Sequence, residues 1–300
     1  MSKNVTVLLG GWSAEREVSL VSGAACVNAL KEAGYDVTPI DVHPDMGALL
    51  TRLYPKPDAV FNALHGRYGE DGCVQGLLDI LGIPYTHSGL MASALAMDKP
   101  MAKHLFKTAG LLVAKHVEAS ADDIFAADLI PRPYVIKPSN EGSSVGVQII
   151  KVGGHNPIID AAMAGGTRMM VEAFIDGREL TVAVMNGKAL AVTEIITHHD
   201  FYDYGAKYEN GGSTHHIPAE IGEDLNSKAM GMAERAYSVL GCRGVARVDF
   251  RFDGENLFIL EVNTQPGMTP TSLVPEQAAH VGISFPDLVS WMVEKAEFDQ

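Results

Sequence analysis

The chain carries a β-hairpin signature in Arg247-Val248-Asp249-Phe250-Arg251-Phe252, Asp253-Gly254 and Phe258-Ile259-Leu260-Glu261-Val262-Asn263. Apolar and polar residues alternate along both arms, and Asp-Gly is a preferred pair in hairpin turns. A turn centred on Glu255 gives one wholly apolar face, which pairs Val248 with Val262, Phe250 with Leu260 and Phe252 with Phe258. The other face pairs Asp249 with Glu261 and Arg247 with Asn263. A slip of one residue breaks this match, because the side-chain period of a strand is two.

The polar face of this hairpin is a candidate metal site. Two carboxylates directly opposite each other, Asp249 and Glu261, repel unless a cation lies between them. Oxygen atoms of Asp, Glu and Asn are ligands that Mg²⁺ prefers, and Mg²⁺ also binds substrate phosphates. The alternative is a solvated sheet face on which Arg247 and Arg251 neutralise the acids.

Residues 1–90 alternate between strand and helix signals. The predicted strands are Val5–Leu9, Val37–Ile40, Ala59–Leu64 and Ile83–Tyr85, and the predicted helices are Ser22–Glu32 and Asp71–Leu81. This alternation predicts a parallel, Rossmann-like sheet with crossover helices. Functional loops of such a sheet lie at the carboxyl ends of its strands, which indicates the loops Gly10–Glu17 and His65–Gly72.

The rest of the chain has a different pattern, in which strands follow one another. The predicted strands are Tyr134–Lys137, Gly146–Lys151, Met169–Phe174, Leu180–Met185 and Ala189–Ile196, and the predicted helices are Asp98–Thr108 and Leu225–Leu240. Asn186-Gly187 is a strong hairpin turn signal. We therefore predict an α/β protein whose C-terminal two thirds are antiparallel α+β. Residues 198–217 fit no element, and a loop of this length is usually functional or disordered.

The composition limits the class of protein. The 300 residues are 47% hydrophobic and 20% charged, which suits two or three domains and excludes a disordered chain. No apolar stretch approaches the ~18 residues of a membrane span, so we expect a soluble protein. A net charge of −14 disfavours nucleic acid or an anionic membrane as a partner. Three scattered cysteines without a C-x-x-C pair fit buried thiols in a reducing cytoplasm.

Two loops are candidate anion sites. Lys137-Pro138-Ser139-Asn140-Glu141-Gly142-Ser143-Ser144-Val145-Gly146 joins two predicted strands, and its small residues let backbone N–H groups approach a phosphate beside the lysine. It is not a Walker A motif, and the alternative is an ordinary glycine-serine loop. In Gly10–Ser19 a helix N-terminus could hold a small anion and Glu15 a cationic amine. Alternatively, Glu15 and Glu17 merely complement the helix dipole.

The histidines show no zinc-binding pattern. His198-His199 and His215-His216 are adjacent pairs whose side chains point in different directions, and no H-E-x-x-H motif or cysteine partner accompanies them. His65 differs, because it opens a glycine-rich loop at a strand end. It is either a functional side chain or a turn-capping histidine.

Together these segments resemble the D-alanine–D-alanine ligases of the ATP-grasp superfamily along nearly the whole chain. The matching blocks are Leu8–Ser19, Ala63–Arg67, Gly69–Gly72, Met97–Lys99, Lys137–Gly146, Phe201–Tyr208, Arg247–Asp249, Glu261–Thr264, Pro266–Thr269 and Ser272–Pro275. The resemblance implies an ATP-grasp fold with a Rossmann-like domain at 1–90 and two α+β domains at 91–178 and 179–300. ATP would lie between the sheets of the last two.

The resemblance also implies an activity: two D-alanines are joined through an acyl phosphate, with ATP hydrolysed, for peptidoglycan precursor synthesis. The partners would be ATP and two D-alanine molecules, in a cytoplasmic homodimer. One alternative is a D-alanine–D-lactate ligase or another ATP-grasp carboxylate–amine ligase. Another, from a different class, is a non-catalytic ATP-binding regulator. The regulator predicts damaged metal and oxyanion residues, yet Arg247, Asp249, Glu261 and Asn263 are all intact.

By the same resemblance, several residues would hold ATP and two Mg²⁺ ions, for which Mn²⁺ can substitute. The metal ligands would be Asp249, Glu261 and Asn263. The phosphate ligands would be Lys99, Lys137, Ser143 and Ser144. The adenosine site would consist of Glu172, Phe174, Glu179 and the backbone of Ala173 and Ile175. Many relatives have lysine at the position of Ala173.

Further residues would hold the amino acids. Glu15 would pair with the ammonium group of the first D-alanine, and His65 would lie near its carboxylate. The oxyanion would be stabilised by Arg247 and the Gly267 N–H. The carboxylate of the second D-alanine would bind Ser272 and the Leu273 N–H, at an apparent helix start.

The long segment 198–217 would be a lid, because water must be excluded from an acyl phosphate. The resemblance places Lys207 and Tyr208 on this lid, with Tyr208 meeting Glu15 and Ser143 when it closes. In the family, tyrosine here accompanies D-alanine as the second substrate. Tyr208 therefore favours the dipeptide product.

Overall fold

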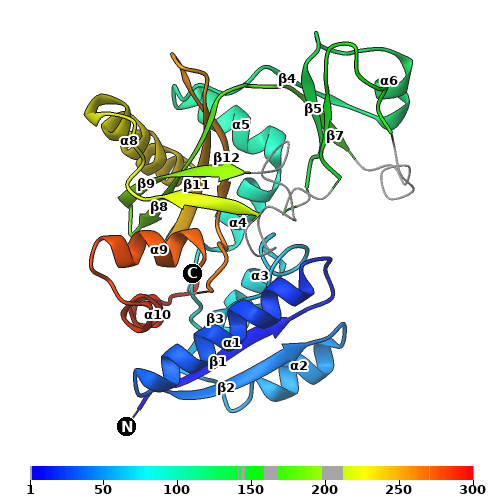
Figure 1. Cartoon of the computed structure of the whole chain (residues 1–300). Helices are drawn as coiled ribbons and strands as arrows, with labels where there is room; N and C mark the ends of the chain where they lie inside the picture. The colour runs from blue at the N-terminus through cyan, green and yellow to red at the C-terminus, as the bar shows by residue number, and fades with distance from the viewer. Residues whose placement is uncertain are drawn as a thin grey trace.

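The computed structural model describes residues 2–140, 142, 146–158, 168–197, 212–269 and 271–299. These residues form three β-sheets, one parallel and two antiparallel. Figure 1 shows the parallel N-terminal sheet at the bottom, the largest sheet above it and the small sheet at the upper right. The predicted fold class, α/β with antiparallel α+β material after the N-terminal part, is confirmed.

The N-terminal sheet has the order β2-β1-β3 and is parallel. Its elements are β1 (Asn4–Gly10), α1 (Arg16–Glu32), β2 (Asp36–Val42), α2 (Met46–Arg52), β3 (Ala59–Asn62) and α3 (Cys73–Leu81). β1 is buried along nearly its whole length, which accounts for its unbroken apolar run. The loops after β1 and β3 therefore leave the same edge of the sheet and carry Glu15 and His65.

Two predicted elements differ here. The strand Ile83–Tyr85 is wrong: Tyr85 makes only isolated bridges to Val60 and Glu297, and Pro84 has no N–H for a ladder. α1 begins at Arg16, before the predicted Ser22. Its first turn lacks apolar periodicity and is held instead by a tertiary contact, since Arg16 donates to both carboxylate oxygens of Asp41 at 2.8 Å.

The small antiparallel sheet has the order β4-β7-β5-β6. The helices α4 (Leu90–Met97) and α5 (Lys99–Thr108) precede it, and its elements are β4 (His116–Ala119), α6 (Ala121–Ala126), β5 (Tyr134–Pro138), β6 (Gln148–Ile150) and β7 (Met169–Ala173). The N-terminus of α5 is joined to the end of β5, because the Lys99 N–H donates to the Ser139 carbonyl at 3.1 Å. This contact fixes α5 relative to the small sheet.

The largest sheet is antiparallel and has the order β10-β9-β8-β11-β12. Its elements are β8 (Arg178–Met185), β9 (Lys188–Thr197), β10 (Ser213–His216), α8 (Glu223–Val239), β11 (Val245–Phe252), β12 (Leu257–Asn263), α9 (Leu273–His280) and α10 (Phe285–Glu294). Asn186 and Gly187 have φ values of 51° and 76°, as a two-residue type I′ turn requires. The predicted hairpin between β8 and β9 is therefore confirmed.

The β11–β12 hairpin follows the predicted register only from Arg247 to Asp249, where Asp249 faces Glu261. A register shift after Asp249 then places Phe250 opposite Ile259 and Phe252 opposite Leu257. The predicted pairs Phe250–Leu260 and Phe252–Phe258 are wrong. The physical reason is a long-range contact: the Ile259 N–H donates to the Leu112 carbonyl at 2.9 Å, and the shift buries Ile259 completely.

The shifted register makes a stability prediction. Ile259→Ala should lower the free energy of unfolding by about 2–5 kcal/mol, because it leaves a cavity under the sheet. Leu260→Ala removes a neighbouring side chain that is half-buried and should cost about 1 kcal/mol. Urea unfolding of both variants measures the difference. A larger loss for Leu260→Ala would support the unshifted register instead.

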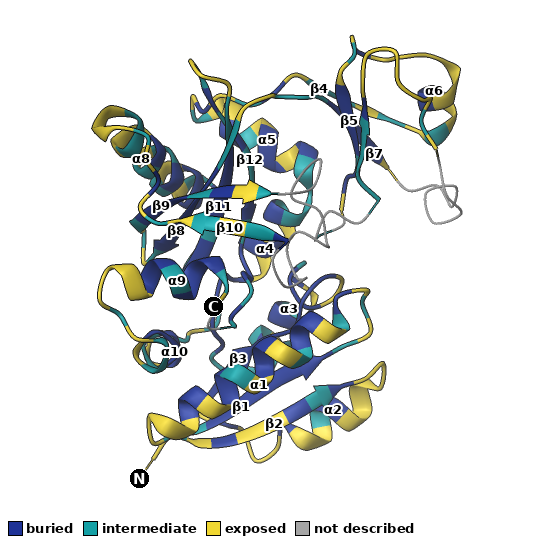
Figure 2. Ribbon diagram, in the orientation of Figure 1, coloured by how far each residue is buried: buried dark blue, intermediate teal, exposed yellow. Residues whose placement is uncertain are grey.

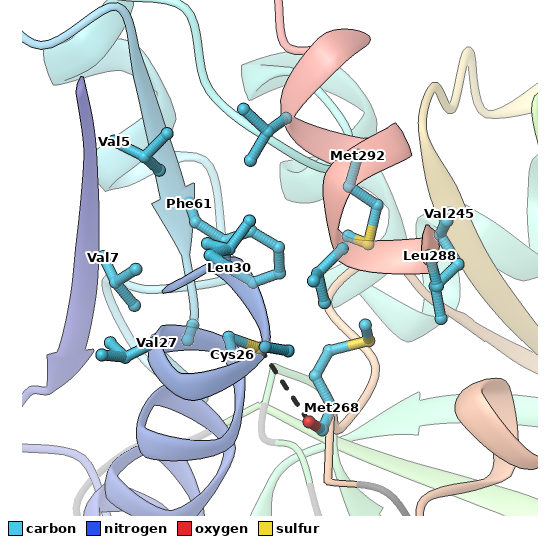
Figure 3. Packing of buried hydrophobic residues seen from close by; sticks show 14 of the residues in the cluster. Val5, Val7, Cys26, Val27, Leu30, Phe61, Val245, Met268, Leu288 and Met292 are labelled. Atoms are coloured by element: carbon cyan, nitrogen blue, oxygen red, sulfur yellow. Dashed lines mark hydrogen bonds between the residues drawn. The ribbon is translucent and has the colours of Figure 1, made fainter. Parts of the chain in front are cut away.

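One hydrophobic core joins the N-terminal part to the end of the chain. Figure 3 shows Cys26 and Leu30 of α1 beside Leu288 and Met292 of α10, with Met268 between them. Cys26 Sγ lies 3.9 Å from the Met268 carbonyl oxygen. Figure 2 shows where the N-terminal part contributes to this core: the residues along β1 and on one side of α1 are buried. This core holds the loop after β1 near the segment before α9. Among the described residues, no helix is long and apolar enough to cross a membrane.

Candidate active site

A cavity of about 410 Å³, with polar and apolar residues in its lining, lies between the N-terminal sheet and the largest sheet. Its walls come from segments far apart in the sequence: the loops after β1 and β3, the start of α5, strands β11 and β12, and the segment before α9. The predicted site residues that line it are Glu15, His65, Lys99, Arg247, Glu261, Asn263, Gly267, Ser272 and Leu273. The fold therefore brings residues of the predicted metal, phosphate and amino acid sites together around one cavity.

The N-terminal wall holds two carboxylates and an imidazole. Glu15, His65 and Glu70 are all buried, and His65 Nδ1 lies 4.0 Å from Glu70 Oε2. His65 Nε2 is buried and has no hydrogen-bond partner among the described residues. Gly142 lies against both acids, because a Cβ atom there would come within 2.9 Å of Glu70 Oε1 and 3.0 Å of Glu15 Oε2. Two buried acids can form ion pairs with an ammonium group. His65 Nε2, which has no partner among the described residues, could form a hydrogen bond with a polar group of the same ligand.

The sheet wall presents Arg247, Glu261 and Asn263 to the cavity, whereas the predicted metal ligand Asp249 is buried and is not among the lining residues. Arg247 donates from Nε and a terminal nitrogen to the two oxygens of Asp249, each at 2.9 Å. The Thr181 hydroxyl donates to Asp249 Oδ1 at 2.6 Å. Glu261 faces Asp249 across the ladder, and Asn263 follows on the same face. The donor set fits Mg²⁺, while the Arg247–Asp249 pair is also what a neutralised sheet face would show.

In the described part of the chain, no group of three or more His, Cys, Asp or Glu side chains has the arrangement of a metal site. A metal ion on this face would therefore need the Asn263 amide oxygen beside the two carboxylates. The Asn263 side-chain oxygen already accepts from the Gln265 N–H at 2.9 Å, which fixes the orientation of the amide.

The third wall is a turn that leads into α9. Ser272 Oγ accepts from the Thr269 N–H at 3.1 Å and lies 2.8 Å from Thr269 Oγ1. A Cβ atom at Gly267 would come within 3.2 Å of Ser272 Oγ, so the two residues are close neighbours. Leu273 is the first residue of α9, and the unpaired N–H groups of a helix N-terminus attract anions. This wall suits a carboxylate.

A buried ion cluster connects α5, β5 and β7. Lys137 Nζ donates to Glu172 Oε2 at 2.7 Å, and Lys103 forms an ion pair with Glu172 Oε1. Burial by itself would raise the pKa of Glu172, but the two ammonium groups outweigh it and lower the pKa to about 2. Burial lowers the pKa of Lys103, and Glu172 opposes this effect. Glu172 is therefore an anion held by two lysines.

This cluster predicts a pH dependence of stability. Because the folded state lowers the pKa of Glu172 from 4.5 to about 2, its contribution is complete above pH 4.5 and is lost as the pH falls below that value. The difference in unfolding free energy between the wild type and Glu172→Gln should shrink by about 1.4 kcal/mol for each pH unit below that point. Urea unfolding from about pH 6 to about pH 3 measures it. A difference that does not change with pH would show that the lysines do not lower the pKa of Glu172. Glu255→Gln, at an exposed turn, is the control and should show no such pH dependence.

The predicted adenosine residues lie outside the cavity lining, on the crossover between the two antiparallel sheets. Glu172 and Ala173 end β7, Phe174 and Ile175 follow, and Glu179 lies near the start of β8. The Ala173 and Phe174 N–H groups donate to the carbonyls of Lys115 and Pro133, at 2.8 and 3.2 Å. Glu179 Oε2 lies 2.9 Å from an Arg251 nitrogen. These contacts fix the crossover between the sheets.

Some predicted residues cannot be placed, and others were missed. Ser143, Ser144, Lys207 and Tyr208 lie outside the described residues. Sequence reasoning assigned no role to Lys103, Glu70, Thr181 and His215, although His215 was considered and rejected as a zinc ligand and Glu70 lies in a block that matches the family. His215 lines the cavity, and its Nδ1 lies 2.7 Å from Glu276 Oε2. Lys103 had a usable signal, since it follows Lys99 by four positions on one helix face. The roles of Thr181 and His215 depend on contacts that no local pattern shows.

A parallel N-terminal sheet beside two antiparallel sheets, with a cavity lined by acids, an arginine and a helix N-terminus, is the arrangement expected of an ATP-grasp ligase. Two family models match the chain: "D-ala D-ala ligase C-terminus" over residues 105–294 and "D-ala D-ala ligase N-terminus" over residues 48–88. The chain belongs to the D-alanine–D-alanine ligase family.

Individual relatives agree over their whole length. The chain is 57% identical over 301 residues to a D-alanine–D-alanine ligase of Rhodospirillum rubrum, with 100% of each chain covered. It is 57% identical over 297 residues to one of Acidiphilium cryptum, with 98% of each covered. Among solved structures, a D-alanine–D-alanine ligase from Bacillus anthracis has a TM-score of 0.85 at 31% identity, covering 98% of this chain and 97% of the other. The same enzyme complexed with ATP has a TM-score of 0.81 at 30% identity, covering 98% and 96%.

Proposed function

We propose that this chain joins two D-alanines into D-alanyl-D-alanine with hydrolysis of ATP, for peptidoglycan precursor synthesis. The observation that carries the proposal is the cavity, whose lining combines the buried acids Glu15 and Glu70, the Arg247 guanidinium beside Glu261, and a helix N-terminus. A carboxylate–amine ligase must hold three groups: the ammonium of the donor, its reacting carboxyl group, and the carboxylate of the acceptor. The N-terminal wall would bind the ammonium group of the donor, the sheet wall would lie beside its reacting carboxyl group, and the turn before α9 would bind the carboxylate of the acceptor. The full-length relatives named for this activity support the same reading.

The donor D-alanine would occupy the N-terminal wall. Glu15 would bind its ammonium group, and the buried Nε2 of His65 would lie near its carboxylate. A carboxylate has no leaving group, so an amine cannot displace an oxygen from it directly. Transfer of the γ-phosphoryl group from ATP to a carboxylate oxygen supplies phosphate as the leaving group and releases ADP.

ATP would lie over the crossover between the antiparallel sheets. Glu172, Ala173, Phe174, Ile175 and Glu179 would form its adenosine site, while Lys99, Lys137, Ser143 and Ser144 would hold its phosphates. Asp249, Glu261 and Asn263 would hold two Mg²⁺ ions, with Mn²⁺ as a substitute. When bound, these ions supply positive charge that offsets the charge of the phosphates.

The acceptor D-alanine would lie against α9. Ser272 Oγ and the Leu273 N–H would bind its carboxylate, which directs its amine, once deprotonated, to the carbonyl carbon of the acyl phosphate. Arg247 and the Gly267 N–H would stabilise the negative charge that forms on the carbonyl oxygen. Phosphate then leaves, and the amide bond is complete. Lys207 and Tyr208 would exclude water during these steps. Of the predicted lid 198–217, residues 213–216 are not a loop but form β10, which pairs with β9.

The test is product formation by the purified protein. With ATP, Mg²⁺ and D-alanine, we expect ADP, phosphate and D-alanyl-D-alanine in equal amounts, and no ADP release with L-alanine. Adding D-lactate in competition tests the acceptor. Predominant ester product at neutral pH would contradict the proposal, as would ADP release without D-alanine. The three-domain division, the cytoplasmic location and the homodimer remain part of this proposal; light scattering in solution tests the last.

A further inference from the structure

Lys103 is a charged residue to which the proposed reaction assigns no role. It lies on α5, one helical turn after Lys99, and its side chain is 0% exposed. A buried lysine without a partner strongly destabilises a folded protein. Here Lys103 pairs with Glu172, whose side chain is only 2% exposed.

Glu172 also holds Lys137, but the two lysines are not equivalent. The Lys137 side chain is 15% exposed, so of the three members of the cluster it alone reaches toward solvent. Lys103 contacts Glu172 Oε1 and Lys137 contacts Oε2, so each lysine has its own oxygen. Lys137 can therefore turn away without disturbing the Lys103 contact.

The separate contacts of Lys103 and Lys137 matter for the charge balance of the cluster when a phosphate binds. If Lys137 turned to an incoming phosphate and Glu172 had no other partner, a buried carboxylate would be left uncompensated, which is costly. Lys103 removes that cost, because it stays paired with Glu172 whatever Lys137 does. The hydrogen bond from the Lys99 N–H to the Ser139 carbonyl fixes α5, and with it Lys103, relative to β5, which carries Lys137.

We propose that Lys103 is a positioning residue for nucleotide binding: as the fixed counterion of Glu172, it releases Lys137 to bind the phosphates of ATP. The inference rests on the proposed function, because it assumes that Lys137 is a phosphate ligand. Without Lys103, Lys137 would be the one ion-pair partner left to Glu172 among the described residues, and ATP would have to compete for it. The defect should then depend on the presence of Glu172 and on the phosphates of the ligand.

The experiment is a double-mutant cycle read by equilibrium binding of ATP and of adenosine, with thermal unfolding to verify folding. Lys103→Met should weaken ATP binding about ten-fold or more, the scale of one charged hydrogen bond, and change adenosine binding little. In the Glu172→Gln background the same substitution should have almost no effect on ATP, because the carboxylate that pairs with Lys137 is then gone. Lys107→Met, on an exposed face of the same helix, is the matched control.

The possible outcomes distinguish the phosphate role of Lys137, which belongs to the proposed function, from the positioning role of Lys103. If Lys137→Met binds ATP like the wild type, the phosphate role of Lys137 fails, and with it part of the proposed function. If Lys137→Met is weakened while Lys103→Met is not, the proposed function stands and the inference about Lys103 is wrong. Equal loss of ATP and adenosine, or a Lys103→Met defect that persists with Glu172→Gln, would show a packing role instead.

Lys103→Met could also fail to fold, since it leaves Glu172 with one partner. The double variant Lys103→Met/Glu172→Gln then decides, because it contains neither the buried lysine nor the buried carboxylate. A ratio of ATP to adenosine affinity like that of the wild type supports the proposal, and a ten-fold lower ratio overturns it.

Discussion

Glu261→Gln should abolish phosphoryl transfer while the protein stays folded. Glu261 lines the cavity and lies directly opposite Asp249, so the substitution removes one of two facing carboxylates. We expect kcat to fall by about 10³-fold or more, the effect of several kcal/mol of lost charge stabilisation at the phosphates. Stability should be unchanged or slightly higher, because repulsion between Asp249 and Glu261 is relieved.

The measurement is ADP release with D-alanine over a titration of Mg²⁺. A metal role predicts that high Mg²⁺ recovers part of the lost activity. Glu255→Gln, in the exposed turn of the same hairpin, should leave kcat and the Mg²⁺ dependence unchanged. Near-normal turnover of Glu261→Gln at moderate Mg²⁺ would contradict the metal assignment and favour a face neutralised by Arg247.

Arg247→Lys should lower kcat by about 10²–10³-fold, although the charge is kept. Arg247 uses two of its nitrogens on the two oxygens of Asp249, at 2.9 Å each, which fixes the plane of the guanidinium. The guanidinium also lines the cavity, where it would stabilise a developing oxyanion. A lysine ammonium is a point charge and cannot hold Asp249 with a fork while donating elsewhere.

The split between kcat and KM identifies the role of Arg247. Loss of oxyanion stabilisation lowers kcat and kcat/KM alike, whereas loss of ground-state binding raises KM with kcat unchanged. The control is Arg235→Lys on the exposed side of α8, which should behave as the wild type. A rise in KM for D-alanine at constant kcat would assign Arg247 to substrate binding instead.

The charge of the chain illustrates why composition gives limited information about a site. A net charge of −14 disfavours a polyanion such as ATP when it is taken for the whole molecule. The structure separates the charges: Lys103 and Lys137 surround one buried carboxylate near the crossover, and Arg247 is paired with Asp249. The net charge of the whole chain therefore does not describe the charge at a particular site.

The predicted hairpin shows where sequence reasoning works and where it stops. The pairs from Arg247 to Asp249 followed from alternation, because each face of a strand must be consistently buried or exposed. The shift beyond Asp249 could not be predicted, since it depends on hydrogen bonding between Ile259 and Leu112. The same limit applies to α1, whose polar first turn is held by Asp41 from a neighbouring strand.

The sequence by itself determined the fold class, because apolar periodicity fixes local elements, and its resemblance to a known family indicated many of the residues that line the cavity. Only the tertiary structure decided how these residues are paired. Lys103, Thr181 and His215 gained their roles from partners far away in the chain, at Glu172, Asp249 and Glu276. The physical reason is that a buried charge must find a partner in space, and distance along the chain does not record which one it finds.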